Sequence, residues 1–231
     1  MSGTMFEPKA LAFLRELKEN NDREWFQPRK DEYEALLRGP TMATVEALNQ
    51  VLPPEYVTDP GKSVYRIYRD TRFGEDKTPY KTHVGALLWH QRLGKDGGAG
   101  LYFHLSTDEF LIAAGLYHCS NELLLKVRNH IAAEHAALTK LLRRKPVREM
   151  FGEIQGDKLT RPPRGFDPAH PAIEYLKMKD FLLETTMAPE VALQADAFVV
   201  LKRHLVELIP FVSFLNRAFP GKTKVVDYLR T

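Results

Sequence analysis

The sequence predicts an α+β fold, in which an antiparallel sheet of about four or more strands is covered by N-terminal and C-terminal helices. Two observations support this prediction. Apolar residues recur at helical spacing near both ends of the chain, and short runs of β-forming residues with short connections occupy the middle. The length of 231 residues suits a single α+β domain over residues 1–231, with helices over about 6–51, the sheet over about 63–117, and helices with a proline-rich loop over about 120–220.

Three helices are expected at the start of the chain. An apolar stripe at helical spacing predicts the first over residues 6–19. A second helix follows, and Gly39 and Pro40 are expected to end or kink it before a third helix continues to Val51.

Four sequential strands are expected in the middle of the chain, near residues 63–69, 83–90, 100–106 and 109–117, because these runs are rich in β-branched and aromatic residues. The connections between the last three strands are short. Parallel strands need a crossover of a dozen or more residues, so these three strands are expected to pair antiparallel.

Helices return after the strands. A helix is expected from about Ser120, and an irregular, proline-rich segment occupies residues 146–172. A short helix is expected over 172–183, followed by a long amphipathic helix that Pro210 kinks. Long irregular segments inside compact domains are more often functional than accidental, so the proline-rich segment is a candidate part of a site.

Composition narrows the class of protein. Apolar residues make up 44% of the chain and charged residues 27%, which is usual for a globular protein and excludes wholesale disorder. The formal net charge of +3 is small for a nucleic-acid-binding protein. Cys119 is the only cysteine, so an internal disulfide is excluded. The sequence contains no signal-peptide core and no membrane span, so a cytoplasmic protein without a membrane partner is expected.

The stretch from Ser63 to His83, which we call the arginine-rich stretch, carries the strongest functional signal. It reads SVYRIYRDTRFGEDKTPYKTH, with arginines set among aromatic residues. Guanidinium groups bind carboxylates and phosphates through two parallel hydrogen bonds and stack on rings, so this composition is typical of an anion site. The candidate anion-binding residues of the stretch are Arg66, Arg69, Arg72, Lys77 and Lys81.

A second basic segment, again shaped by prolines, lies further along the chain. It contributes the candidate anion-binding residues Arg161, Arg164 and Lys177. We expect the two segments to meet in one cleft, where carboxylates or an external anion would compensate the gathered cations. The alternative is that these residues form structural salt bridges or lie on independent surface loops.

Asp70 and His83 are the candidate acid–base groups. Asp70 adjoins two arginines and could equally orient a guanidinium group. His83 and His104 would be neighbours if the strands near 83–90 and 100–106 pair. The sequence has no clear metal-ligand spacing, P-loop or dinucleotide-binding glycine pattern, so no metal site and no cofactor are predicted, and no nucleophile constellation indicates a reaction.

Three sequence signatures carry a resemblance to a known family. They are FLRELKENNDREWF at 13–26, RIYRDTRFGEDKTPYKTH at 66–83 and DKLTRPPRGFDPAHPAIEYLKMKDF at 157–181. With them the chain resembles a widespread microbial family catalogued as a domain of unknown function, over nearly its whole length. The resemblance implies a single α+β domain and no established activity, so it transfers no catalytic residues.

The sequence leaves three functions open. The first is a small-molecule binding protein or enzyme with an Arg/Lys-lined cleft for a phosphorylated or carboxylated ligand. The second is a nucleic-acid-binding module, for which basic segments with interleaved aromatic residues are typical. The third is a structural or partner-binding domain in which the charges form internal salt bridges. A concave, partly exposed cluster favours the first, a broad exposed stripe the second, and full pairing with carboxylates the third.

Overall fold

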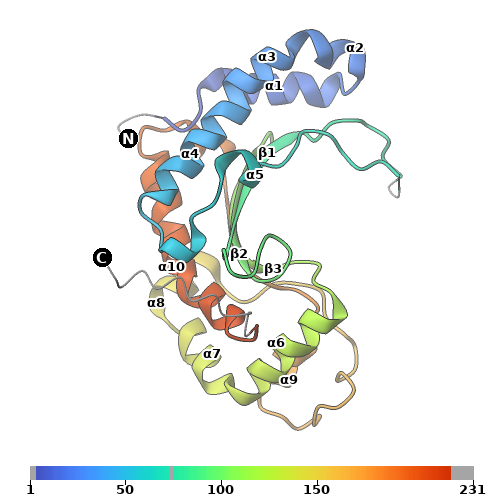
Figure 1. The fold of residues 1–231 in the computed structure, drawn as a ribbon, viewed down its shortest axis with the longest axis vertical. Helices are drawn as coiled ribbons and strands as arrows, with labels where there is room; N and C mark the ends of the chain where they lie inside the picture. Colours follow the sequence, from blue (N-terminus) through green and yellow to red (C-terminus); the bar gives the residue numbers. More distant parts are fainter. Residues whose placement is uncertain (1–3, 73–74, 220–231) are drawn as a thin grey trace.

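A four-stranded antiparallel sheet lies at the centre of the computed structural model, which describes residues 4–72 and 75–219 (Figure 1). The strands are β1 (His83–Trp89), β2 (Gly100–Ser106), β3 (Phe110–Leu116) and β4 (Phe181–Met187), in the order β1-β2-β3-β4. Every neighbouring pair is antiparallel. The predicted α+β fold, with helices from both ends of the chain around an antiparallel sheet, is therefore confirmed.

The expected strand over 63–69 is wrong, so the sheet does not span 63–117. This segment makes only isolated bridges, from Val64 to Ala86 and from Tyr68 to Tyr80. The backbone N–H of Tyr65 still donates to Gly85 O at 3.0 Å, but the residues after it bond to positions 79 and 81 of the same arginine-rich stretch. The chain therefore leaves the edge of β1 and pairs with itself.

The fourth strand comes from β4, part of which was expected to be a helix over 172–183. Only one turn there is helical, α9 (Ile173–Leu176). Along β4 the buried Phe181 and Leu183 alternate with the less buried Leu182 and Glu184. A period of two is that of a strand with one face on the core, and it outweighs the short helical pattern before it.

One face of the sheet is packed on helices. Val84, Ala86 and Leu88 of β1 are buried on this face. The helices α4 (Gly39–Asn49) and α10 (Ala197–Asn216) pack on it, and in Figure 1 they lie together on one side of the sheet. Buried apolar side chains form one continuous cluster that runs from Met5 to Phe219. The other face of the sheet is left for the site described below.

The N-terminal region consists of one separate helix followed by a nearly continuous helical run. The first is α1 (Pro8–Glu19), and the run comprises α2 (Arg23–Phe26), η1 (Gln27–Arg29), α3 (Lys30–Tyr33), η2 (Glu34–Arg38) and α4. A π-helical turn at η2 directly precedes Gly39 and Pro40. Its wider hydrogen bonding lets the helix continue past the proline, which therefore does not end it. The turns η3 (Pro54–Tyr56) and α5 (Pro60–Ser63) follow.

The C-terminal half adds the remaining helices. They are α6 (Asn121–Ala133), α7 (His135–Leu142), α8 (Lys145–Phe151), the 3₁₀ turn η4 (Pro189–Leu193) and α10, which contains Pro210. Within residues 4–72 and 75–219, no helix has the length and hydropathy required to span a membrane.

Three asparagines hold loops by the same arrangement. Asn21 donates from Nδ2 to Tyr80 O at 3.0 Å and accepts from Tyr80 N at 3.0 Å. Asn49 makes the same pair of bonds with Thr58, and Asn216 makes it with Ala99. A side-chain amide can satisfy one backbone N–H and one C=O together, as a neighbouring strand would. Asn21 and Asn216 in this way fix the segments that carry Lys81 and Lys95, which belong to the site described below.

Candidate functional site

The open face of the sheet forms a cleft of about 1080 Å³, which we call the sheet cleft. Its floor is a cross-strand row of Leu87, Tyr102, Ala113 and Glu184, one residue from each strand. In Figure 1 the arginine-rich stretch lies above the concave side of the sheet, and α6 lies below it. Residues from both of these regions line the cleft.

A glycine in the floor makes room for a tyrosine. A Cβ atom at Gly85 would lie 2.8 Å from His104 Cβ and 2.9 Å from Tyr102 Oη. These separations are too short for any side chain larger than hydrogen. Gly85 therefore allows Tyr102 to lie across β1 with its hydroxyl group beside His104.

The basic wall of the cleft consists of two lysines on one aromatic ring. The Nζ atoms of Lys81 and Lys95 lie 4.9 Å and 4.3 Å from the centroid of the Tyr65 ring. Burial lowers the pKa of both lysines, and the pKa of Lys81 is lowered further by repulsion from Arg66 and Lys95. Cation–π contacts with Tyr65 therefore hold two like charges close together.

An asparagine side chain fixes the backbone close to each lysine. Asn21 binds the backbone of Tyr80, directly before Lys81. Asn216 binds the backbone of Ala99, at the end of the loop that carries Lys95. The two cations are thus positioned by the fold before any ligand arrives, which lowers the ordering cost of binding.

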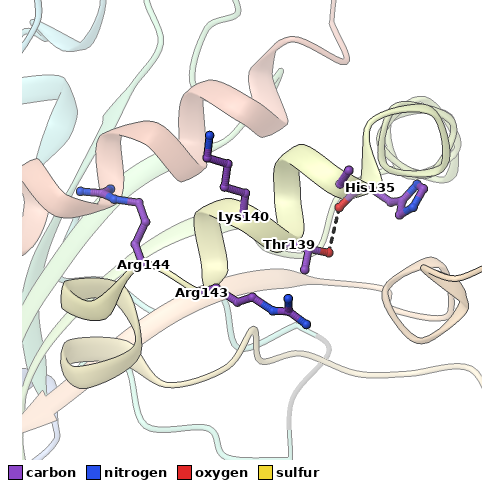
Figure 2. Close-up of a pocket in the computed structure, with 6 residues that line it drawn as sticks. His135, Thr139, Lys140, Arg143 and Arg144 are labelled. Carbon is purple, nitrogen blue, oxygen red and sulfur yellow. Dashed lines mark hydrogen bonds between the residues drawn. The ribbon is translucent and has the colours of Figure 1, made fainter.

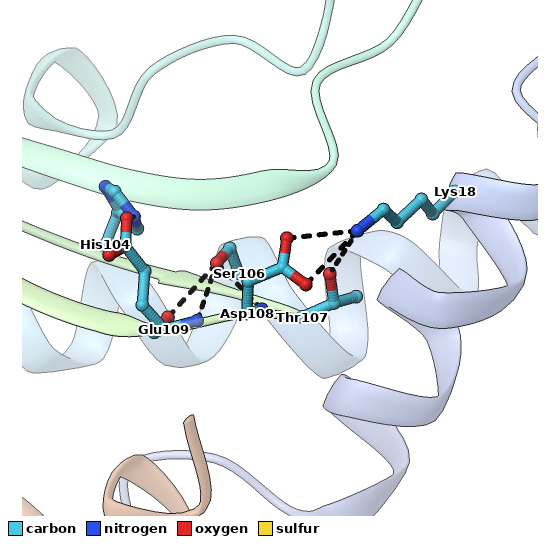
Figure 3. Close-up of polar contacts among 6 residues, drawn as sticks. All are labelled: Lys18, His104, Ser106, Thr107, Asp108 and Glu109. Carbon is cyan, nitrogen blue, oxygen red and sulfur yellow. Dashed lines mark hydrogen bonds and ion pairs between the residues drawn. The ribbon is translucent and has the colours of Figure 1, made fainter. Parts of the chain in front are cut away.

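A chain of three polar side chains starts at Tyr102 in the floor and leads through His104 to Glu109. His104 Nδ1 lies 3.1 Å from Tyr102 Oη, and His104 Nε2 lies 3.1 Å from Glu109 Oε1. Figure 3 shows Glu109 beside His104, next to the β2–β3 turn where Lys18 binds Asp108. Burial lowers the pKa of His104, and the Glu109 carboxylate opposes that shift.

His83 lies next to this chain. Its ring centroid is 5.1 Å from that of His104, so the expected proximity of the two histidines is confirmed. Burial lowers the pKa of His83 to about 4, and repulsion from His104, Lys81 and Arg69 adds to the shift. Both rings are therefore neutral at neutral pH.

The β4 side of the cleft, which begins with Glu184 at the end of the floor row, is acidic, and we call it the acidic wall. Burial raises the pKa of Glu184, and repulsion from Glu109 raises it further. The buried Asp180 accepts a hydrogen bond of 2.7 Å from the backbone N–H of His118, which has φ +51°. Left-handed backbone at a residue other than glycine is strained, so Asp180 holds a strained turn at the edge of the cleft.

Comparison with protein families gives a match across most of the chain. Residues 9–214 match the sequence model of a family described as conserved hypothetical protein (DUF2461). The chain belongs to this family. No curated protein and no solved structure matches it significantly. The family description names no activity, so the functional argument for this DUF2461 member rests on its own residues.

The structure separates the predicted residues of the arginine-rich stretch. Lys81 and His83 line the sheet cleft. Arg66 is exposed and lies close enough to Lys81 for the two charges to interact. Phe73 and Gly74 of the same stretch lie outside the described residues.

The other cations of the stretch are engaged within their own loop. Arg69 binds Asp76 and Thr78, and Arg72 binds Asp70 at 2.7 Å. Lys77 donates to Thr71 O at 2.9 Å. These contacts support the salt-bridge alternative for Arg69 and Arg72, and they make Asp70 the partner of Arg72.

The second predicted segment reaches the cleft with different residues from those expected. Gln155, Gly156 and Asp157 line the sheet cleft, whereas Arg161, Arg164 and Lys177 do not. Arg161 and Arg164 are exposed on the loop, and Lys177 binds Glu174 at 2.7 Å. The two segments therefore meet at the cleft, but the second brings carboxylates in place of cations.

A second, smaller hollow of about 540 Å³ lies along α7. Its cations point in different directions in Figure 2, and Arg144 binds Glu207 at 2.9 Å. A set of side chains that diverges cannot surround one anion. In the described parts of the chain, no group of three or more His, Cys, Asp and Glu side chains is arranged to hold a metal ion.

Sequence reasoning missed Lys95, Tyr102, Glu109 and Glu184. The alternation of the predicted strand over 100–106 already places Tyr102 and His104 on one face. Lys95 lies in a glycine-rich turn without any local signal, and Glu184 belongs to the strand that was not predicted. Tyr102 could therefore have been found from the sequence, through its place beside His104 on one face of the strand.

Proposed function

We propose that the protein binds a small carboxylated or phosphorylated molecule in the sheet cleft, with the anionic group against Lys81 and Lys95. One observation carries the proposal: two half-buried ammonium groups share the ring of Tyr65. Within residues 4–72 and 75–219, neither lysine has a carboxylate oxygen within 4.0 Å. An anion between them would remove their mutual repulsion.

Electrostatics favour this position over the rest of the surface. Burial disfavours the charged form of both lysines and lowers the pKa of each, and repulsion from Arg66 and Lys95 lowers the pKa of Lys81 further. A bound anion would reverse that effect, and screening by water is weaker in a cleft than on an open surface. The same cations on a flat surface would gain little from an anion.

The acidic wall suggests what the rest of the ligand carries. Glu184, Asp180 and Asp157 line the cleft on the side away from the lysines. Carboxylates accept hydrogen bonds, so hydroxyl or amino groups on the ligand would suit this side. We therefore expect a polar metabolite with an anionic group at one end and hydrogen-bond donors at the other.

A thermal-shift experiment tests the proposal. Inorganic phosphate and a panel of carboxylated and phosphorylated metabolites are compared with their uncharged analogues at constant ionic strength. A ligand that binds only the native state must raise its melting temperature. We expect saturable stabilisation by at least one anionic compound.

Variants assign the stabilisation to the cleft. Lys81→Met and Lys95→Met are expected to abolish it. Lys77→Met and Arg69→Ala are the matched controls, because both cations lie on the neighbouring loop and bind loop groups. Stabilisation that survives in both cleft variants, or that is lost in the two controls, would place the anion elsewhere.

A further inference from the structure

We propose that Tyr102, His104 and Glu109 form a proton relay whose outer end, the Tyr102 hydroxyl, accepts a proton from a hydroxyl group of a molecule in the cleft. This inference adds acid–base chemistry to the binding function. The anionic character of the molecule rests on the function proposed above, whereas the relay rests on its own geometry.

The chemistry of the three groups fixes the direction of the hydrogen bonds. An ionised carboxylate can only accept, so the proton between His104 and Glu109 belongs to His104 Nε2. A neutral imidazole carries one proton, which leaves His104 Nδ1 as an acceptor. The Tyr102 hydroxyl, 3.1 Å away, must then donate to Nδ1. Within residues 4–72 and 75–219, no other group bonds to Tyr102 Oη, so its lone pairs can accept a proton.

Burial keeps the relay ready to receive a proton. The side chains of His104 and Glu109 are 15% and 33% exposed, so their contact is only partly screened by water. Burial lowers the pKa of His104, which keeps the ring neutral at neutral pH. Glu109 would stabilise the imidazolium once it forms, as the carboxylate does in hydroxyl–imidazole–carboxylate triads.

The proton transfer balances without any co-reactant. The ligand O–H gives its proton to Tyr102 Oη while the original Tyr102 proton moves to His104 Nδ1. The products are a ligand alkoxide and an imidazolium bonded to Glu109, with Tyr102 again neutral. No electrons are exchanged, and the reverse transfers restore the starting state. The alkoxide would lie on the side of the cleft that carries Lys81 and Lys95.

The placement of Tyr102 supports a role in the cleft. The side chain lies on the open face of the sheet, and Gly85 is the residue that leaves space for its hydroxyl. The ring is 6.1 Å from that of Tyr65, which holds both lysines. The free lone pairs of Tyr102 and the two cations therefore belong to one cavity.

Labelling with benzenesulfonyl fluoride tests the relay, because this neutral reagent does not need the anion site. The Tyr102 oxygen would attack sulfur, fluoride would leave, and the phenolic proton would pass to His104. Peptide mass spectrometry measures the labelling rate of each tyrosine. Tyr117, which is 68% exposed, is the internal reference.

We expect Tyr102 to be labelled about tenfold faster than Tyr117, although burial raises the pKa of Tyr102 and disfavours its free phenolate. His104→Gln and Glu109→Gln should each slow the labelling of Tyr102 by about tenfold and leave Tyr117 unchanged. Labelling of Tyr102 that is no faster than that of Tyr117, or that does not depend on His104, would overturn the proposal.

A measurement on the unmodified protein covers the case in which a variant fails to fold. Nitrogen NMR of histidine-labelled protein reports which ring nitrogen carries the proton. We expect His104 to carry it on Nε2, with Nδ1 as the unprotonated acceptor. The opposite tautomer would disprove the relay.

The two proposals can fail separately. Fast labelling of Tyr102 without stabilisation by any anionic compound would remove the anion site and keep the relay. Anion-dependent stabilisation with slow labelling of Tyr102 would keep the binding function and remove the relay.

Discussion

The side-chain amide of Asn216 makes both hydrogen bonds that the backbone of Ala99 can offer, with Oδ1 2.7 Å from Ala99 N and Nδ2 3.0 Å from Ala99 O. Asn216 is buried at the end of α10, and its Nδ2 also donates to Tyr56 Oη at 3.2 Å. Helix α10 is thereby joined to the loop that carries Lys95.

Asn216→Asp is expected to destabilise the protein by about 2–4 kcal/mol, because a buried carboxylate cannot donate to Ala99 O or Tyr56 Oη and is left without a cationic partner. The free energy of unfolding from chemical denaturation measures the loss. Asn129→Asp, at an exposed position on α6, is the matched control and should change stability by less than about 0.5 kcal/mol. Equal losses in the two variants would show that the paired hydrogen bonds contribute nothing.

Gly85→Ala is expected to displace Tyr102 and break its hydrogen bond to His104. The added methyl group would lie 2.8 Å from His104 Cβ, and overpacking of this kind costs about 1–3 kcal/mol. Denaturation measures the cost, and the His104 Nδ1 resonance reports the lost hydrogen bond. The double variant with Tyr102→Phe should recover part of the stability, since the phenol oxygen is one of the clashing atoms. A wild-type resonance in Gly85→Ala would contradict the proposed packing.

Stability should fall in mild acid because of His83. Its pKa is lowered to about 4, so between pH 6.5 and 4 the unfolded chain binds a proton that the native chain excludes. The native state therefore loses about 2–4 kcal/mol over this window, and the loss is complete below the folded-state pKa. His104, Lys81 and Arg69 act electrostatically on this ring and oppose its protonation.

His83→Gln checks this prediction. The difference in unfolding free energy between the wild type and the variant should shift in favour of the variant as the pH falls from 7 to 4. Denaturation at three pH values in this window measures the difference. Parallel curves of unfolding free energy against pH would mean that the protonation of His83 is not linked to folding. His104 is present in both proteins, so it should contribute the same pH dependence to each curve.

Lys95→Met is expected to raise the pKa of Lys81, because it removes a like charge from the same ring of Tyr65. NMR titration of the Lys81 ammonium group measures the shift. Lys62→Met is the control. Lys95 binds the backbone oxygen of Lys62, and this substitution leaves that oxygen in place. A pKa of Lys81 that stays constant in Lys95→Met would contradict the electrostatic coupling on which the anion site depends.

The sequence predicted the parts of the fold that depend on local patterns. The strands near 83–90, 100–106 and 109–117 have alternating side chains and short connections, and all three form. The apolar stripe over 6–19 likewise matches α1. The strand over 63–69 failed because β-propensity does not decide which partner a segment meets. The missed β4 pairs with β3 only after a long excursion of the chain, and no local pattern encodes that pairing.

The candidate site was predictable only in part. Lys81, His83 and the proximity of His83 to His104 follow from the arginine-rich stretch and from strand pairing. Composition could not show whether Arg69 and Arg72 bind a ligand or form structural salt bridges. An arginine that binds a carboxylate within its loop has the same sequence signature as one that binds a ligand. Lys95 and Glu184 enter the cleft through tertiary structure alone.

The late position of β4 in the chain has a kinetic consequence. Leu116 and Phe181 are paired neighbours in the sheet, so this contact closes a loop that includes all of α6, α7, α8 and α9. Loop closure must precede the contacts that stabilise it, and distant pairings of this kind slow folding. During synthesis, β1, β2 and β3 can assemble as a meander while β4 is still inside the ribosome. The part of the floor that β1, β2 and β3 supply would therefore form before the acidic wall, whereas the Lys95 loop would wait for Asn216 of α10. The exposed edge of β3 would be the position at which a nascent chain is most open to wrong strand pairing.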